Sequence, residues 1–248
     1  MRLSLCTWAE VEAYLARSAG IIVPIGSTEQ HGPNGLMGTD AICAEAVANG
    51  VGEATGAMVG PVISIGMAQH HLAFPGSITL RPSTMIAFVA DYVFSLARHG
   101  FRRFMFINGH GGNIAPISTA FSEIYAAASL DPSGTVPRLR CTLRNWFDGP
   151  EVARLSREFY GDKLGTHATP AEVALTQHLH PEAIKRVHMT PVVPTRRRFT
   201  DALDLRELHP DGRIGSEPGL ATPEHGRALY EAAVKECAAA WTAFMDEA

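Results

Sequence analysis

Short apolar runs alternate with helical patterns along most of this 248-residue chain. Most of the runs are short and largely apolar, as expected of strands that are buried on both faces. They lie at 20–25, at 57–59 together with 62–65, at 103–107 and at 139–144. Helical patterns lie at about 7–17, 39–53, 83–99 and 114–128, from 170 onward and from 223 to the C-terminus. This alternation predicts a three-layer α/β/α fold with a mostly parallel central sheet, formed by a single domain over 1–248.

Three threonines mark expected helix starts. Thr7 and Glu10 have the spacing of a capping box, Thr39 precedes an Ala-rich helix, and Thr222 precedes a proline and a glutamate. The segment 187–220 contains four prolines and little periodicity. An irregular segment of this length is typical of an active-site loop or a subunit contact.

Composition excludes several classes of protein. The chain is 46% hydrophobic and 19% charged, with a formal net charge of −4, so it does not have the composition of a disordered protein. Basic residues are scattered apart from Arg196, Arg197 and Arg198, so we expect no nucleic-acid partner. No export signal or membrane-spanning stretch is visible, and the four cysteines are far apart. We therefore expect a soluble cytoplasmic protein with reduced thiols and no membrane partner.

Metal-binding side chains gather where the predicted strands end. The candidate ligands are Glu29, His31, Asp40, His110 and Glu172, and His167 lies in the same segment as Glu172. The carboxyl ends of parallel strands form the usual ligand-binding edge of such a sheet. Positions 29 and 31 project to the same side of an extended chain, and nearby glycines allow position 40 to fold back toward them. Carboxylates and imidazoles suit Zn²⁺, Mn²⁺ or Fe²⁺, so the pattern suggests a two-metal hydrolytic site.

Other interpretations of these residues remain open. Glu172 also completes a capping box with Thr169, and His110 can simply donate to a backbone carbonyl in a tight turn. The glycines of 108–113 resemble a phosphate cradle, but the spacing matches neither nucleotide-binding motif and a lysine is missing. Ser-His-Asp catalysis is disfavoured because no G-x-S-x-G sequence is present.

Four ordered motifs resemble those of the creatininase (creatinine amidohydrolase) family. They are GSTEQHGP at 26–33 followed by GTD at 38–40, HLAFPGS at 71–77, NGHGGN at 108–113 and GTHATPAE at 165–172. The segments GSEP at 215–218 and AT at 221–222, with Gly226, are similar to the end of the family pattern. The resemblance spans nearly the whole chain. It implies a creatininase-like α/β/α fold, a dinuclear metal centre with two divalent ions per subunit, and homo-oligomers, often hexamers.

The resemblance also assigns ligands. It implies that Glu29 and His110 bind one metal, that His31 binds the other, and that Asp40 bridges them. In creatininase the third motif resembles NGHYEN, whose glutamate completes the second metal site; Gly112 stands at that position here. We therefore expect Glu172 to complete the second site instead.

The resemblance further implies residues that face the substrate. His167 corresponds to a family histidine near the substrate, where a neutral imidazole can act as acid and base. We expect Glu172 to take part in catalysis as well, as a ligand of the metal centre. His71 corresponds to a position beside the pocket, in a substrate-wall or a structural role. Relatives often carry Ser and Glu where this chain has Ala68 and His70, which indicates an altered substrate wall. Further pocket candidates are Gly111, Gly112, Trp146 and the segment 187–220.

The predicted activity is hydrolysis of an amide C–N bond in a small molecule, either a cyclic amide or a formamide, by a metal-activated water. Zn²⁺ is the expected ion, with Mn²⁺ or Fe²⁺ as alternatives. Backbone N–H groups of 109–112 are candidates for stabilising the oxyanion. Three alternatives remain: a deformylase acting on a nucleotide-derived pyrimidine, a peptidase acting on short peptides, and a metal-free binding module without catalysis.

Overall fold

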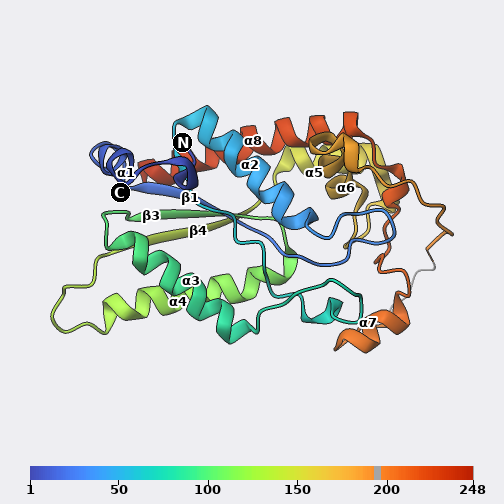
Figure 1. Ribbon diagram of the computed structural model, residues 1–248, viewed down its shortest axis with the longest axis horizontal. Coiled ribbons are helices and arrows are strands. Elements are labelled where there is room, and N and C mark those ends of the chain that lie inside the picture. The colour runs from blue at the N-terminus through green and yellow to red at the C-terminus, as the bar shows by residue number, and fades with distance from the viewer. Residues whose placement is uncertain (193–196, 248) are drawn as a thin grey trace.

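A four-stranded parallel sheet forms the centre of the protein (Figure 1). The computed structural model describes residues 1–192 and 197–247, so Arg196 of the predicted basic cluster lies outside the described residues. The strands are β1 (Gly20–Ile25), β2 (Met58–Val59), β3 (Arg103–Asn108) and β4 (Arg140–Asn145), in the order β2-β1-β3-β4. Ile25 pairs with Asn108, which pairs with Asn145, so the carboxyl ends of three strands lie level.

Helices cover both faces of the sheet. The α-helices are α1 (Trp8–Leu15), α2 (Thr39–Thr55), α3 (Pro82–Ala97), α4 (Ile114–Ser129), α5 (Pro150–Tyr160), α6 (Pro170–Leu179), α7 (Ala202–Leu208) and α8 (Pro223–Asp246). Short 3₁₀ turns lie at Leu3–Leu5, Gln69–His71, Gly111–Asn113, Gly161–Lys163, Pro181–Ala183 and Pro218–Leu220. Helices α2, α5, α6 and α8 lie on one face, and α3 and α4 on the other (Figure 1). The predicted α/β/α layering is therefore confirmed.

Alternation along the strands separates two hydrophobic clusters. Ile22 of β1 packs with α2 and α8, whereas Ile21 and Val23 pack on the other side with α3 and α4. Successive side chains of a strand point to opposite faces, so a continuous apolar run supplies both clusters. This is why the run at 20–25 contains no polar alternation.

Several predicted elements differ from the structure. The second strand is only Met58–Val59; Pro61 interrupts the run, and Ile63 forms only an isolated bridge to Ile25. Proline lacks the N–H group that a longer ladder needs. Thr39 does not cap α2: Gly38 is the N-cap, and the Thr39 hydroxyl donates to Leu36 O at 2.7 Å.

Two helices were not predicted. Helix α5 follows β4 directly, and α7 lies inside the segment that was expected to be irregular. The other predicted caps are confirmed: Thr7 forms a capping box with Glu10, and Thr222 accepts from the His225 N–H. Within the described residues, no helix combines the length and the apolar character that crossing a membrane requires.

The start of α2 packs directly against the end of β3. A Cβ atom at Gly109 would lie 2.1 Å from Asp40 O, which is far inside van der Waals contact. The missing side chain therefore lets the first turn of α2 approach the strand end. As a result, the Asp40 side chain lies at the carboxyl edge of the sheet.

We predict that Gly109→Ala destabilises the protein by about 1–3 kcal/mol, because the new methyl group must push backbone apart. The matched control is Gly111→Ala, where an added Cβ meets nothing within 4 Å. Urea unfolding midpoints of the two variants measure the difference. Equal midpoints would show that the contact between α2 and β3 does not limit stability.

Candidate metal centre

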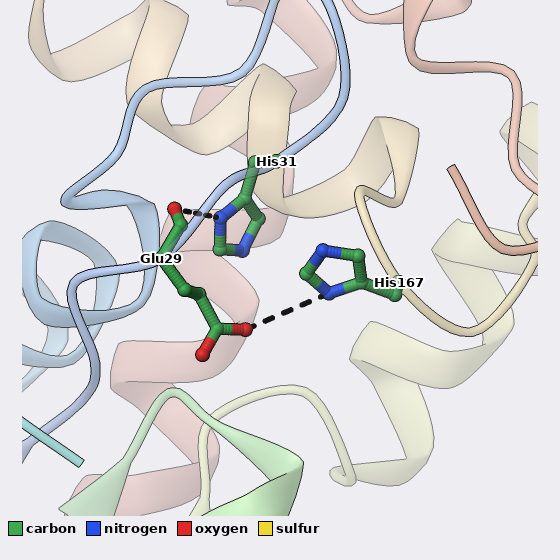
Figure 2. A group of neighbouring side chains, drawn as sticks. All are labelled: Glu29, His31 and His167. Atoms are coloured by element: carbon green, nitrogen blue, oxygen red, sulfur yellow. Dashed lines mark hydrogen bonds and ion pairs between the residues drawn. The ribbon is translucent and has the colours of Figure 1, made fainter. Parts of the chain in front are cut away.

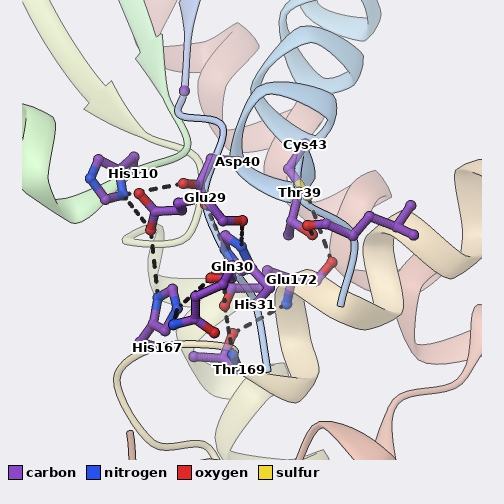
Figure 3. Close-up of polar contacts among 12 residues, drawn as sticks. Glu29, Gln30, His31, Thr39, Asp40, Cys43, His110, His167, Thr169 and Glu172 are labelled. Carbon is purple, nitrogen blue, oxygen red and sulfur yellow. Dashed lines mark hydrogen bonds and ion pairs between the residues drawn. The ribbon is translucent and has the colours of Figure 1, made fainter. Parts of the chain in front are cut away.

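Six polar side chains from distant parts of the sequence meet at the carboxyl edge of the sheet. They are Glu29, His31, Asp40, His110, His167 and Glu172 (Figures 2 and 3). Glu29 and His31 follow β1, Asp40 lies in the first turn of α2, and His110 follows β3. The structure thus brings together every residue that the sequence nominated as a ligand. They form three overlapping groups, and the ligand atoms of each group lie within 4.8 Å of one another.

The first group consists of Glu29, Asp40 and His110. His110 Nε2 lies 2.9 Å from Met67 O, an acceptor, so this nitrogen carries the proton. His110 Nδ1 then presents its lone pair 3.2 Å from Glu29 Oε1 and 3.1 Å from Asp40 Oδ2. A lone pair facing two carboxylate oxygens is unfavourable unless a metal ion lies between them or a proton occupies Nδ1, and these carboxylates raise the pKa of His110 against the effect of burial. This geometry is that of a metal ligand oriented by a backbone carbonyl.

The second group consists of His31, Asp40 and Glu172. His31 Nδ1 lies 3.1 Å from Glu29 O, and its Nε2 lies 3.0 Å from Asp40 Oδ1 and 3.8 Å from Glu172 Oε1. Asp40 therefore directs one carboxylate oxygen to each group. This arrangement fits the bridging role that the family resemblance implied for Asp40.

The charges of the centre favour cations. Glu29 is fully buried and Asp40 is 2% exposed, and both Glu29 oxygens and Asp40 Oδ2 lack a hydrogen-bond donor among the described residues. Burial raises the pKa of Glu29 and raises the pKa of Glu172 to about 7. Burial opposes charge on His31, but the Asp40 carboxylate outweighs it and raises the pKa of His31 to about 10. Carboxylates left without donors and imidazole lone pairs aimed at one point fit divalent metal ions.

Glu172 caps α6 and also lies in a group of candidate ligands. Its Oε1 accepts from the Thr169 N–H at 2.6 Å, and the Thr169 hydroxyl accepts from the Glu172 N–H, so the capping box is formed. The same carboxylate belongs to the second group of candidate ligands. A carboxylate has several acceptor sites, so capping the helix does not prevent it from binding a metal.

His167 and His71 stand beside the candidate ligands. His167 Nδ1 is 3.7 Å from Glu29 Oε1 (Figure 2), and His71 Nε2 is 3.3 Å from the same oxygen. Burial lowers the pKa of both imidazoles, so both are neutral at pH 7. His167 also belongs to a third group with Glu29 and His31, which places it within reach of a metal.

The loop after β3 is packed tightly around His110. A Cβ at Gly112 would lie 2.4 Å from His110 Nε2 and 2.5 Å from Met67 O, so the smallest residue is needed there. The N–H groups of Gly109 and His110 are already bonded to Ile25 O and Asn108 Oδ1. These two groups are therefore not free to bind an oxyanion.

The other pocket candidates lie in different surroundings. Gly111 is exposed, whereas Trp146 is 2% exposed and packs in the cluster with α2 and α8; their role as pocket wall stays a prediction. A cavity of about 670 Å³ lies elsewhere, lined by Asn34, 184–189 and the start of α8, and none of the six candidate ligands lines it.

Sequence analysis missed two residues beside the centre. Gln30 is buried between two ligand positions and bonds to several groups of the site. Phe199 stacks on His70 with ring centroids 5.5 Å apart, and His70 lies 6.4 Å from the His110 ring. The one sequence signal for Gln30 is its position between Glu29 and His31 in the first motif. No comparable signal marks Phe199.

Comparison with known proteins agrees with this centre. The sequence model of the family described as "Creatinine amidohydrolase" matches residues 4–241. This chain belongs to the creatininase family. One curated relative is the mycofactocin precursor peptide peptidase of Mycolicibacterium smegmatis, to which the chain is 36% identical over 232 residues. The alignment covers 88% of this chain and 82% of that protein.

Two further comparisons concern creatininases themselves. The chain is 36% identical over 135 residues to the creatinine amidohydrolase of Pseudomonas putida, covering 50% of this chain and 52% of that protein. A solved structure described as creatininase Mn superposes with a TM-score of 0.85 and 24% identity, covering 99% of both chains. At this identity the superposition shows the fold, which is the creatininase fold.

We predict that gently purified protein contains about two divalent ions per chain and that Asp40→Asn contains close to none, because Asp40 serves both groups. Inductively coupled plasma mass spectrometry measures the content. A wild-type protein without metal, even after resupply with Zn²⁺, Mn²⁺ and Fe²⁺, would contradict the centre.

Glu172→Gln separates the two roles of Glu172. Glutamine at this helix position still completes a capping box, so the unfolding midpoint should change little. The neutral amide is a weaker metal ligand, so we expect a loss of about one ion per chain. Thr169→Ala is the converse control, with a lower unfolding midpoint and unchanged metal content. A normal ion count in Glu172→Gln would leave Glu172 as a cap alone.

Proposed function

We propose that this protein is a metal-dependent hydrolase of amide C–N bonds. The observation that supports the proposal is the pair of ligand groups that share Asp40, one with Glu29 and His110 and the other with His31 and Glu172. When bound there, two divalent ions lower the pKa of a water molecule and polarise a carbonyl oxygen. Zn²⁺ and Mn²⁺ suit this mixture of carboxylate and imidazole ligands, and Fe²⁺ is the third candidate.

His167 is the proposed acid and base. Its Nε2 lies 2.8 Å from Gln30 O, so it donates there and leaves the Nδ1 lone pair facing the centre. A neutral imidazole in this position accepts a proton at Nδ1 from the nucleophilic water and returns it to the departing nitrogen. The low pKa of His167 favours the neutral form that this sequence of transfers needs at the start.

A small cyclic amide or formamide is the proposed substrate, with a short peptide as the second candidate. The peptide is favoured by one observation: the peptidase relative aligns over 88% of this chain, whereas the creatinine amidohydrolase relative aligns over 50%. A deformylase of a nucleotide-derived pyrimidine would use the same centre. The intact ligand set argues against a binding module without catalysis. We also propose a homo-oligomer, for which a hexamer is one possible form.

We predict that Zn²⁺- or Mn²⁺-loaded protein hydrolyses at least one member of a panel of cyclic amides, formamides and short peptides. Mass spectrometry detects the ring-opened product of a cyclic amide as a gain of one water, and release of formate or amine reports cleavage of the other two classes. His167→Gln should lower kcat by about 10²–10⁴-fold with normal metal content, because it removes proton transfer but not the metal ligands. Absence of hydrolysis across the panel by fully loaded protein would sink the proposal. A fall in metal content in His167→Gln would instead identify His167 as a ligand.

A further inference from the structure

The side chain of Gln30 lies at the meeting point of two histidines and a distant loop. It is 6% exposed, and its Oε1 accepts from the Gly32 N–H at 2.8 Å. Its Nε2 has three close neighbours, which are Gly212 O at 3.0 Å, His71 Nδ1 at 3.0 Å and His167 Nε2 at 2.9 Å. Figure 3 shows Gln30 next to His167, among the candidate ligands.

The number of hydrogens on the Gln30 amide decides which of these contacts are hydrogen bonds. An amide nitrogen has only two hydrogens for its three neighbours. His167 Nε2 also lies 2.8 Å from the backbone oxygen of Gln30, which can only accept, so His167 donates its proton there. The two hydrogens of the Gln30 amide are then just enough for Gly212 O and His71 Nδ1. His71 must consequently carry its own proton on Nε2.

This assignment has a consequence for the metal ligands. His71 Nε2 lies 3.3 Å from Glu29 Oε1, so its proton faces a buried carboxylate oxygen that has no hydrogen-bond partner among the described residues. His167 keeps its Nδ1 lone pair directed to the centre. We propose that Gln30 is a positioning residue that sets the tautomer of His71, and through it the orientation of the Glu29 carboxylate.

The distant loop is part of the same arrangement. A Cβ at Gly212 would lie 1.9 Å from Gln30 Oε1, and Gly212 has a φ of +86°, so a side chain there would be both strained and blocked. The Gly212 carbonyl is therefore held against the Gln30 amide and accepts one of its two hydrogens. Because Gly212 O accepts one hydrogen of the Gln30 amide, the other is left to donate to His71 Nδ1.

The test compares Gln30→Glu with the wild type, both loaded with Zn²⁺ and labelled with ¹⁵N-histidine. Protonated and unprotonated imidazole nitrogens differ strongly in ¹⁵N chemical shift, and His71→Asn and His167→Asn assign the signals. The wild type should carry the proton on Nε2 of both histidines. Glutamate has the same shape as glutamine but cannot donate when ionised, so the His71 proton should move to Nδ1 in Gln30→Glu.

The effect on turnover rests on the proposed amide hydrolysis, whereas the tautomer measurement does not. We expect kcat to fall about 10–100-fold with little change in KM, which is the usual effect of losing a partner of a metal ligand. Gln177→Glu is the matched control, because Gln177 is also buried, at 8% exposed, but lies outside this network on α6. It should keep both tautomers and the wild-type kcat.

A second variant, Gln30→Met, removes the donor without adding a charge and should also lose the single His71 tautomer. A wild-type spectrum with the His71 proton on Nδ1 would overturn the inference, as would unchanged His71 tautomers in both Gln30 variants. If the wild type hydrolyses no amide but shows the expected tautomers, the proposed function fails and the positioning role stands. If hydrolysis is found but the tautomers do not respond to Gln30, only the positioning role fails.

Discussion

Burial of three carboxylates at one point is the constraint on which this structure depends. Glu29 and Asp40 are removed from water almost completely, and Glu172 lies beside them. Buried carboxylates are costly unless their charge is balanced. Divalent cations held by these groups would balance it. Without them the carboxylates favour protonated His31 and His110, so the pKa values of both imidazoles are raised.

Backbone carbonyls provide much of the orientation at this centre. His31, His110 and His167 each lie against a backbone oxygen through one nitrogen and direct the other toward the carboxylates. A backbone acceptor is held by the fold itself, so these tautomers do not depend on neighbouring side chains. His71 is different because a side-chain amide, that of Gln30, orients it.

The residues around the candidate ligands are Gly112, His70 and Phe199, and their positions depend on close packing. Gly112 is excluded from having a side chain by the His110 ring and Met67 O, so a glutamate at this position would displace the ligand rather than join it. His70 lies between the His110 ring and Phe199, which belongs to the segment 187–220. Phe199 of that segment thus lies beside the site, which agrees with the prediction of an active-site loop.

The sequence by itself determined most of the alternating strands and helices, the caps at Thr7 and Thr222, and the candidate ligand residues. Local patterns suffice for these, because apolar periodicity, capping spacing and ligand types are written in neighbouring positions. Only the tertiary structure decided that Asp40 reaches both groups through separate oxygens and that Glu172 caps α6 while lying among the candidate ligands. It alone brought Gln30 to Gly212 across 182 positions of the chain. These facts depend on close approach between distant segments, and no local pattern encodes a distance of that kind.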